Sequence, residues 1–150
     1  MVNIPIANKA EKEGIIHVLD DDSKYGAYAW KVMSNVLSYA AFLVPEVGDT
    51  PVGVDDAMKM GYNWIKGPFE LIDEIGADYL IDRLEAEQRP VPEDLRQTSG
   101  SSFYDGLKAR TYGGGWEDIQ RPDGTLRFND RRKTLTPQNS NDEASWYAMD

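Results

Sequence analysis

Very few residues of this chain have a type and spacing suited to catalysis or metal binding. His17 is the only histidine among 150 residues, and there is no cysteine. A zinc site needs several His or Cys ligands, and a histidine base needs its substrate within hydrogen-bond reach. We therefore expect no metal site and interpret His17 as a partly exposed structural residue. Without cysteine, the chain has neither a disulfide nor a thiol nucleophile.

Other polar and glycine-rich motifs also indicate structure more than chemistry. Asp73 and Glu74 are adjacent, so on a helix they point in different directions and make a poor acid–base pair. We expect them to cap backbone groups or to lie at the surface. The three glycines at 113–115 lack the Lys-Ser/Thr of a phosphate-binding P-loop. The acidic run at 20–22 does not begin an EF-hand, because the sixth and twelfth positions lack the required Gly and Glu.

The most distinctive stretch is GYNWIKGPFELIDEIG, residues 61–76, in which three glycines and a proline surround an apolar cluster. Gly61 is suited to close one helix, Pro68 to begin the next, and Gly76 to allow a change of direction. No side chain in the stretch is an obvious nucleophile or general base. We interpret it as a tight corner between helices.

Aromatic residues near this corner could line a ligand pocket, but at helical spacing they are more typical of a core. We predict that Trp64, Phe69 and Leu71 or Ile72 are largely buried. The aromatic residues in question are Tyr28, Trp30, Tyr62, Trp64 and Phe69.

Helical periodicity dominates the middle of the chain. Between positions 25 and 44, apolar residues recur at three- and four-residue steps, which is the pattern of an amphipathic helix. Asp22 or Ser23 is suited to cap its N-terminus, and Pro45 is expected to end it. A short helix is predicted at 54–61, opened by Asp55 and closed by Gly61. Further helices are predicted at 68–76, 77–88 and 90–97.

The chain divides into three predicted regions. Residues 1–22 form an N-terminal arm, in which residues 15–19 are either a short strand or the entry to the first helix. Residues 23–100 form the helical domain. Residues 101–150 form an extension, in which 116–129 have the pattern of a β-hairpin around Arg-Pro-Asp-Gly and 139–143 have the composition of a linker. The expected fold is mainly α, with a C-terminal β-hairpin or extended tail.

The composition argues against nucleic acid and membranes as partners. The chain has 16 basic and 26 acidic residues, which gives a net charge of −10. Nucleic acids and anionic membranes bind basic surfaces. No apolar run approaches the roughly 20 residues of a membrane span, and the N-terminus lacks the apolar core of a secretory signal. A cytoplasmic location is the default expectation.

Residues 54–80, VDDAMKMGYNWIKGPFELIDEIGADYL, closely resemble the C-terminal helical domain of 3-hydroxyacyl-CoA dehydrogenases. In that family, an Asp opens a short helix and is followed by Ala-Met, a Gly, and then Gly-Pro-Phe with an Asp and a Gly behind it. The resemblance implies a helical bundle of that family's type. The matching residues here are Asp55, Ala57, Met58, Gly61, Gly67, Pro68, Phe69, Asp73 and Gly76.

Two stretches, SYAAFLVPE at 38–46 and GYNWIKGPFELID at 61–73, resemble the second of two helical copies in long fused enzymes of fatty-acid β-oxidation. In one such arrangement, a nucleotide-binding domain comes first, then two helical copies, then an enoyl-CoA hydratase domain. The tail from residue 121 onwards looks like the bridge into that hydratase domain. The resemblance covers about residues 23–150 and implies that the chain is a piece of a longer protein.

The resemblance also implies what the parent enzyme does. The parent oxidises a 3-hydroxyacyl-CoA to a 3-ketoacyl-CoA with NAD, and its histidine base and NAD-binding glycines lie in the nucleotide-binding domain. No Gly-x-Gly-x-x-Gly occurs in this sequence. The fragment is therefore expected to bind no cofactor and to be inactive alone. It is expected to close the substrate cleft, to pack against the nucleotide-binding and first helical domains, and to allow homo-oligomers.

The helical domain of the family supplies one Asn to the catalytic site, usually followed by Arg. Asn35 is the positional candidate here, but Val36 follows it, and a second copy does not normally retain the role. Two alternatives stay open: a first, catalytic copy in which Asn35 contacts the acyl group, and a non-enzymatic interaction module that reuses the fold. The missing Arg argues against the first, and the hydratase-like junction argues against the second.

Overall fold

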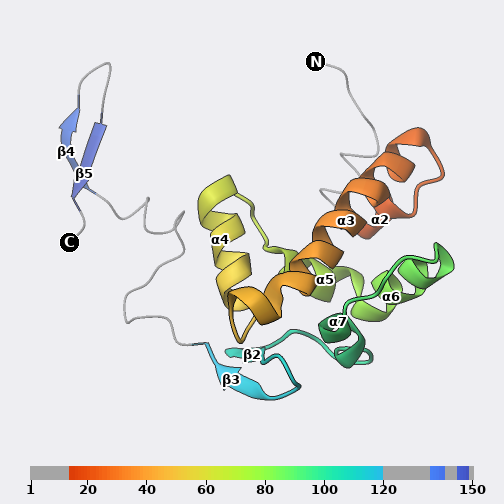
Figure 1. The fold of residues 1–150 in the computed structure, drawn as a ribbon. Helices are drawn as coiled ribbons and strands as arrows, with labels where there is room; N and C mark the ends of the chain where they lie inside the picture. Colours follow the sequence, from red (N-terminus) through yellow and green to blue (C-terminus); the bar gives the residue numbers. More distant parts are fainter. Residues whose placement is uncertain (1–13, 120–135, 141–144, 149–150) are drawn as a thin grey trace. The chain divides into compact units, whose positions relative to one another are not determined.

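The computed structural model describes residues 14–119, 136–140 and 145–148 (Figure 1). The chain separates into two units, Met1–Ile119 and Gln120–Asp150. The first contains helices α2 (Ile16–Leu19), α3 (Lys24–Val47), α4 (Val52–Tyr62), α5 (Pro68–Ile75), α6 (Ala77–Ala86) and α7 (Glu93–Gln97), followed by strands β1 (Tyr104–Asp105), β2 (Lys108–Arg110) and β3 (Trp116–Asp118). The second contains strands β4 (Thr136–Ser140) and β5 (Ser145–Ala148). The described part of the chain is mainly α, which confirms the predicted fold class.

Helix α3 is the element on which α2, α4, α5 and α7 pack. Ser23 caps its N-terminus, as predicted: the side-chain oxygen accepts a hydrogen bond of 3.2 Å from the backbone N–H of Tyr25. The helix runs through Pro45 to Val47, so the predicted end at Pro45 is early. Proline has a helical φ and removes only one backbone donor, and here only two more helical residues follow it.

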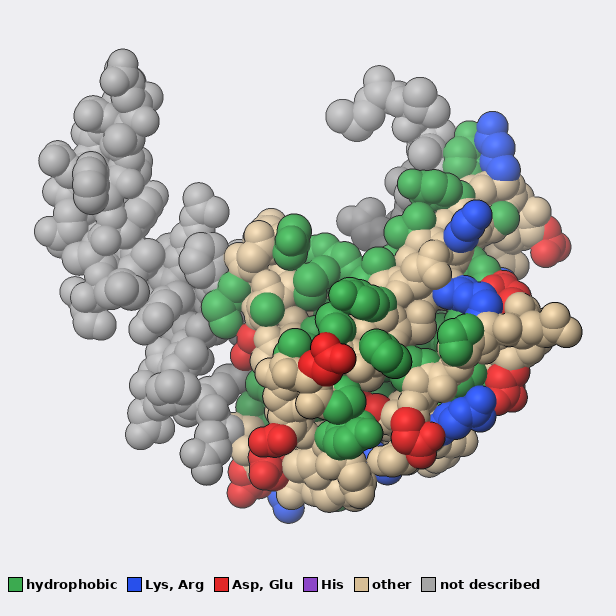
Figure 2. Space-filling view, viewed as in Figure 1, with side chains coloured by type: hydrophobic (Ala, Val, Ile, Leu, Met, Phe, Trp, Pro, Cys, Tyr) green, Lys and Arg blue, Asp and Glu red, His purple; other side chains and the backbone are tan. Residues whose placement is uncertain are grey.

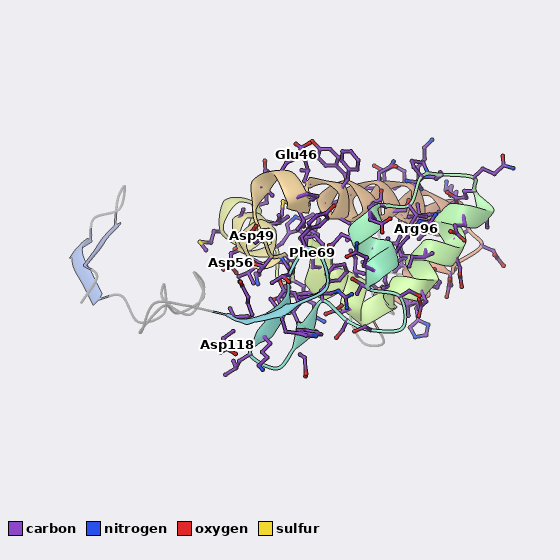
Figure 3. All side chains as sticks on the ribbon, turned by 60° about the horizontal axis from the view of Figure 1, so that its bottom comes forward. Glu46, Asp49, Asp56, Phe69, Arg96 and Asp118 are labelled. Carbon is purple, nitrogen blue, oxygen red and sulfur yellow. The ribbon has the colours of Figure 1, made fainter. Side chains whose placement is uncertain are left out.

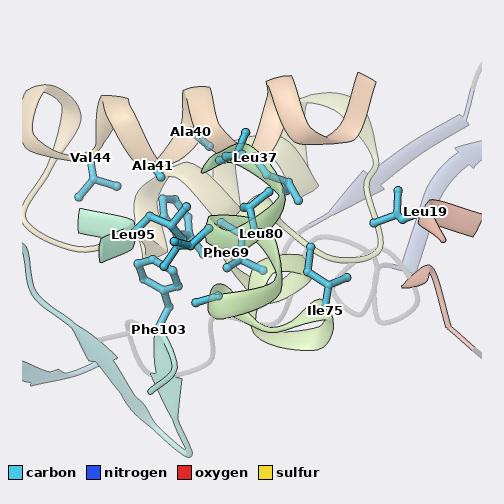
Figure 4. Packing of buried hydrophobic residues seen from close by; sticks show 14 of the residues in the cluster. Leu19, Leu37, Ala40, Ala41, Val44, Phe69, Ile75, Leu80, Leu95 and Phe103 are labelled. Atoms are coloured by element: carbon cyan, nitrogen blue, oxygen red, sulfur yellow. The ribbon is translucent and has the colours of Figure 1, made fainter. Parts of the chain in front are cut away.

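The hydrophobic core lies between α3, α5, α6 and α7 (Figure 4). Phe69 and Ile72 of α5 are each 0% exposed, which confirms their predicted burial, whereas Trp64 is only partly buried. The ring of Phe69 meets the ring of Phe103 edge to face, with 4.8 Å between centroids. Because Phe103 immediately precedes β1, this contact ties the small sheet to the helices.

Both predicted ends of the second helix are wrong. Helix α4 begins three residues before Asp55 and continues past Gly61 to Tyr62. Asn63 adopts the left-handed conformation, with φ 57°, and takes the C-terminal role predicted for Gly61. Helices α5 and α6 agree well with prediction. Gly76 separates them with a φ of 91°, a value that disfavours any side chain.

The stretch at 15–19 contains the short helix α2 and not a strand. The backbone N–H of Leu19 donates to the carbonyl of Ile15 at 3.2 Å. A short apolar run has no periodicity that distinguishes a strand from one turn of helix, which explains the ambiguity of the sequence. Leu19 is buried in the core and anchors this turn.

Strands β1, β2 and β3 form one antiparallel sheet in that order. Strand β3 pairs with β2, where Trp116 faces Arg110. The sequence predicts that Trp116 also begins a hairpin with residues up to 129. The predicted turn around residues 121–124 and its second strand lie outside the described residues. Strands β4 and β5 form a separate antiparallel pair with an irregularity between Pro137 and Asn139. Within the described residues, no helix is both long and apolar enough to cross a membrane.

Candidate functional site

Asn35, the candidate site residue from the sequence, lies on the exposed side of α3. Its Oδ1 atom accepts a hydrogen bond of 2.6 Å from Nη2 of Arg89, in the segment after α6. Nη1 of the same guanidinium donates to Oγ of Ser34 at 2.7 Å and to Glu87 at 3.2 Å. Arg89 therefore binds two neighbouring side chains of α3, and the side-chain carbonyl of Asn35 already accepts a hydrogen bond.

An open apolar groove of about 930 Å³ begins at Asn35 and follows the C-terminal half of α3. Figure 2 shows hydrophobic side chains gathered on the face where α3, α4 and α7 lie. Arg89 and Glu93 supply charge at one wall. The remaining lining includes Val36, Tyr39, Phe42, Leu43, Val54, Met58, Pro68 and Val91. Such a lining suits an apolar ligand or another protein surface and offers no acid–base pair.

A second hollow, of about 580 Å³, is polar and lies by the N-terminal half of α3. The guanidinium of Arg83 stacks on the ring of Trp30, 3.8 Å from its centroid, and donates to the carbonyl of Leu19 at 2.9 Å. Burial opposes ionisation of Glu87, but hydrogen bonds from Trp30 and Arg89 outweigh it and lower the pKa of that carboxyl. These groups contact one another between α2, α3 and α6. The hollow is therefore lined by polar contacts that connect the three helices.

Asp55 is the most unusual carboxylate of the described chain because it is 0% exposed. It accepts hydrogen bonds from the backbone N–H groups of Phe69 and Glu70, at 2.9 and 3.1 Å, and from the hydroxyl of Tyr104 at 2.8 Å. Burial raises its pKa to about 6, although these hydrogen bonds partly oppose the rise. Burial and the nearby Asp55 charge raise the pKa of Tyr104. Asp55 thus links α4, α5 and β1.

Gly67 explains why Asp55 can reach the start of α5. A Cβ atom on Gly67 would lie 2.3 Å from Cγ of Asp55, which is far inside contact distance. Gly67 has no side chain with which to cap its own helix, so Asp55 supplies the acceptor from α4. The Glu70 carboxylate accepts from the Gly67 N–H at 2.9 Å and completes the cap.

The carboxylates of the corner at 61–76 also bind backbone or lysine. Asp73 accepts from the N–H groups of Phe103 and Tyr104, at 2.7 and 3.0 Å, and burial raises the pKa of its carboxyl. Glu74 forms an ion pair of 2.7 Å with Lys66. The predicted capping and surface roles of Asp73 and Glu74 agree with these contacts.

The other candidates from the sequence are scattered. His17 is exposed on α2. Tyr28 and Tyr62 are 72% and 74% exposed, whereas Trp30 and Phe69 are buried, so these aromatic residues do not line one pocket. Among the described residues, no group of His, Cys, Asp and Glu is arranged to hold a metal ion.

Arg89 and Tyr104 are among the residues of these sites that were not predicted. Arg89 lies 54 positions from Asn35, and Tyr104 lies 49 positions from Asp55. Neither has a local motif that marks it, because helix and strand periodicity describe only near neighbours in the chain.

Comparison with known proteins agrees with the fold. Residues 26–110 match the protein family described as 3-hydroxyacyl-CoA dehydrogenase, C-terminal domain. The chain is 31% identical, over 99 residues, to a protein of Bacillus subtilis named as a 3-hydroxyacyl-CoA dehydrogenase. It is 30% identical, over 121 residues, to a protein of Rickettsia felis named as a fatty acid oxidation complex trifunctional enzyme.

The chain spans only a small part of these relatives. The matches cover 64% of this chain but 12% of the Bacillus subtilis protein, and 79% of this chain but 16% of the Rickettsia felis protein. No solved structure matches the chain at a comparable level of significance.

Proposed function

The chain belongs to the family of 3-hydroxyacyl-CoA dehydrogenase C-terminal domains, and from this premise we propose that it acts as a packing domain within a longer, NAD-dependent dehydrogenase of fatty-acid oxidation. The parent would oxidise a 3-hydroxyacyl-CoA to a 3-ketoacyl-CoA. This part would be the second helical copy, next to an enoyl-CoA hydratase domain. A cytoplasmic location is part of the same proposal.

The main support for the proposal is that the residues matched by the family are the residues of the helical unit. The match covers residues 26–110, which run from the first turn of α3 to the end of β2. Inside it lie Asp55 and Gly67, whose fit fixes the corner between α4 and α5. The separate matches to the two relatives cover only 12% and 16% of those proteins, which supports a domain that serves a larger enzyme.

The contacts of the buried Asp55 and the partly buried Asp73 support a scaffold role. Asp55 and Asp73 direct their oxygens to backbone N–H groups, which fixes the helix and sheet junctions. A general base must instead reach a proton on the substrate. NAD binding needs a glycine-rich turn between a strand and a helix, where backbone N–H groups hold the pyrophosphate. In our proposal, the nucleotide-binding domain of the parent supplies both functions.

Asn35 has a positioning role in this proposal and not a catalytic one. Its carbonyl oxygen already accepts from Arg89 at 2.6 Å, and Val36 follows it where the family usually has Arg. We propose that Arg89 keeps Asn35 from the acyl substrate and instead fixes the segment after α6 on α3.

Calorimetry with NAD, followed by a binding assay with the nucleotide-binding and first helical domains of the parent, tests the proposal. We expect no NAD binding at micromolar concentration by the chain alone, and stable capture by those domains. Micromolar NAD binding, or reduction of NAD that is lost on His17→Ala substitution, would overturn it.

A further inference from the structure

Helix α4 differs from its neighbours because it contributes almost no apolar side chain to the core. The only buried residue of α4 is Asp55, whereas α5 and α6 each bury several apolar side chains. Val54 packs partly against the core, and Met58 lines the apolar groove. Figure 1 shows α4 at the edge of the helical unit, where it packs on α3 and α5. Burial of apolar area therefore contributes little to holding α4 in place.

Polar contacts hold α4 instead. The Asp55 carboxylate accepts hydrogen bonds from the N–H groups of Phe69 and Glu70. The hydroxyl of Tyr104 donates to the same carboxylate. One turn further along α4, Nζ of Lys59 forms an ion pair of 2.7 Å with Glu70. Because water can replace each of these partners in an open form, and release returns the Asp55 charge to water, the net cost of breaking the contacts is modest.

The segments before and after α4 differ in how firmly they are fixed. Before the helix, Pro51 is buried, and the carbonyl of Asp49 accepts a hydrogen bond of 2.8 Å from the N–H of Tyr112. After the helix, Asn63 has a left-handed φ of 57° and Ile65 is 84% exposed. The N-terminal end of α4 is therefore anchored, whereas its C-terminal end leads into an exposed loop with few packing contacts to restrain it.

One side of α4 forms a wall of the apolar groove along α3. Val54 and Met58 supply this wall. Figure 3 shows Asp56 of α4 towards the edge of the unit and Phe69 of α5 within it. On the outer side of α4, a Cβ atom on Gly61 would meet nothing within 4 Å, so no described atom obstructs the helix at that point.

We propose that α4 is a movable wall of the apolar groove, held closed by the polar contacts of Asp55 and Lys59 and able to swing outwards about Pro51. In the open form, Val54 and Met58 move away from α3 and the groove widens. Helices α3, α5 and α6 keep their shared core, because that core includes no buried side chain from α4. Such local opening of one element, with the rest of the fold intact, is a known form of native-state motion. The motion belongs to the chain by itself and goes beyond the proposed packing role.

Hydrogen exchange of individual amides in the full native chain, followed by NMR at several low urea concentrations, tests the motion. We expect the amides of α4 to exchange through one shared opening, with protection factors at least about tenfold lower than those of α6. The amides of Phe69 and Glu70 should share this opening although they belong to α5, because both donate to Asp55 of α4.

The amides of Phe103 and Tyr104 are the matched control. They also donate to a carboxylate, at 2.7 and 3.0 Å, but that carboxylate is Asp73 of α5. They should keep the higher protection of the core. Exchange of α4 only together with α6 would show that α4 has no motion of its own. Fast exchange in α4 with the two Asp55-bound amides protected as well as the control pair would show fraying of α4 without release of Asp55. Either result would overturn the proposal.

Lys59→Ala tests which contacts hold α4 closed. Alanine is the better helix former, so faster exchange in this variant does not come from lower helix propensity. We expect the protection of α4 to fall by about tenfold and that of α6 to stay unchanged. Lys66→Ala is the matched variant, because Lys66 forms an ion pair of the same length, 2.7 Å, with Glu74 but lies outside α4. It should leave α4 unchanged, and equal effects of the two substitutions would contradict the role of Lys59.

Discussion

The carboxylate of Asp55 and the backbone N–H of Phe69 are joined by a buried hydrogen bond of 2.9 Å, although they belong to different helices. Two more donors, Glu70 N–H and the Tyr104 hydroxyl, converge on the same carboxylate. The N-terminus of α5 is thereby capped from α4, and β1 is attached to both. This junction gives a structural role to Gly67, at the start of α5, and to Asp55.

Replacing Asp55 by Ala should destabilise the fold. The change leaves one buried donor, the Phe69 N–H, and two partly buried donors without an acceptor. An unsatisfied buried group costs about 1–3 kcal/mol, and removal of a buried charge partly offsets the loss. We expect a net loss of about 3 kcal/mol in the free energy of unfolding, measured by urea titration. Asp82→Ala on the exposed face of α6 is the control, with an expected change within about 0.5 kcal/mol. Equal effects would show that Asp55 does not hold the junction.

Gly67→Ala should be destabilising even though the φ of Gly67, −75°, suits any residue. The new Cβ would overlap the Asp55 side chain, and overpacking of this kind costs about 1–3 kcal/mol. Gly61→Ala is a contrasting control, because Gly61 lies inside α4 and a Cβ atom there would meet nothing within 4 Å. It should stabilise the chain by about 0.5–1 kcal/mol. A shift of thermal unfolding in the same direction by both substitutions would contradict the close fit of Gly67 against Asp55.

Phe69→Ala should cost about 3–5 kcal/mol, the usual penalty for removing a buried aromatic ring. Phe69 is fully buried and packs on Phe103, so its loss also loosens the sheet. Ile65→Ala is the control, since Ile65 is 84% exposed. A loss below roughly 0.5 kcal/mol for Phe69→Ala would contradict the described core.

The raised pKa of Asp55 predicts a specific dependence of stability on pH. Because the folded-state pKa is about 6 and the ordinary value is 3.8, the folded chain binds this proton more tightly than the unfolded chain. The Asp55 contribution to the free energy of unfolding should therefore fall as pH rises from about 4 to about 6, by up to about 3 kcal/mol.

Urea titrations of the native chain and of Asp55→Asn across that pH range isolate this contribution. Asp73 and Asp94, whose pKa values are also raised by burial, are common to both proteins and cancel in the difference. The stability of the native chain relative to Asp55→Asn should decrease with rising pH. An increase over the same range would mean that the Asp55 pKa is lowered in the folded state.

Much of the fold follows from local sequence signals. Ser23, Pro68 and Gly76 mark helix boundaries because capping, a fixed φ and a positive φ are local properties. The burial of Phe69 follows from the apolar spacing of its helix. These features need no knowledge of distant residues.

The errors arise where distant contacts decide the structure. Asp55 has a residue type that often begins a helix, which led to the wrong boundary. Its actual partner, the N–H of Phe69, lies 14 positions away in the sequence and is brought close only by folding. The pairing of β3 with β2 was likewise not predicted, because it joins Trp116 to Arg110 across a loop that has no strand periodicity. The role of Asn35 stays a prediction from the family resemblance, and its contact with Arg89 could not be predicted because it depends on the packing of the segment after α6.

The central claim is that this chain serves a dehydrogenase by packing and not by chemistry. The most direct test measures formation of NADH from NAD and a 3-hydroxyacyl-CoA. The parent enzyme is made without this segment, and the chain is then added back as a separate protein. We predict little activity from the truncated parent, none from the chain alone, and recovery when the two are mixed. Full activity of the truncated parent, or turnover by the chain alone, would contradict the account.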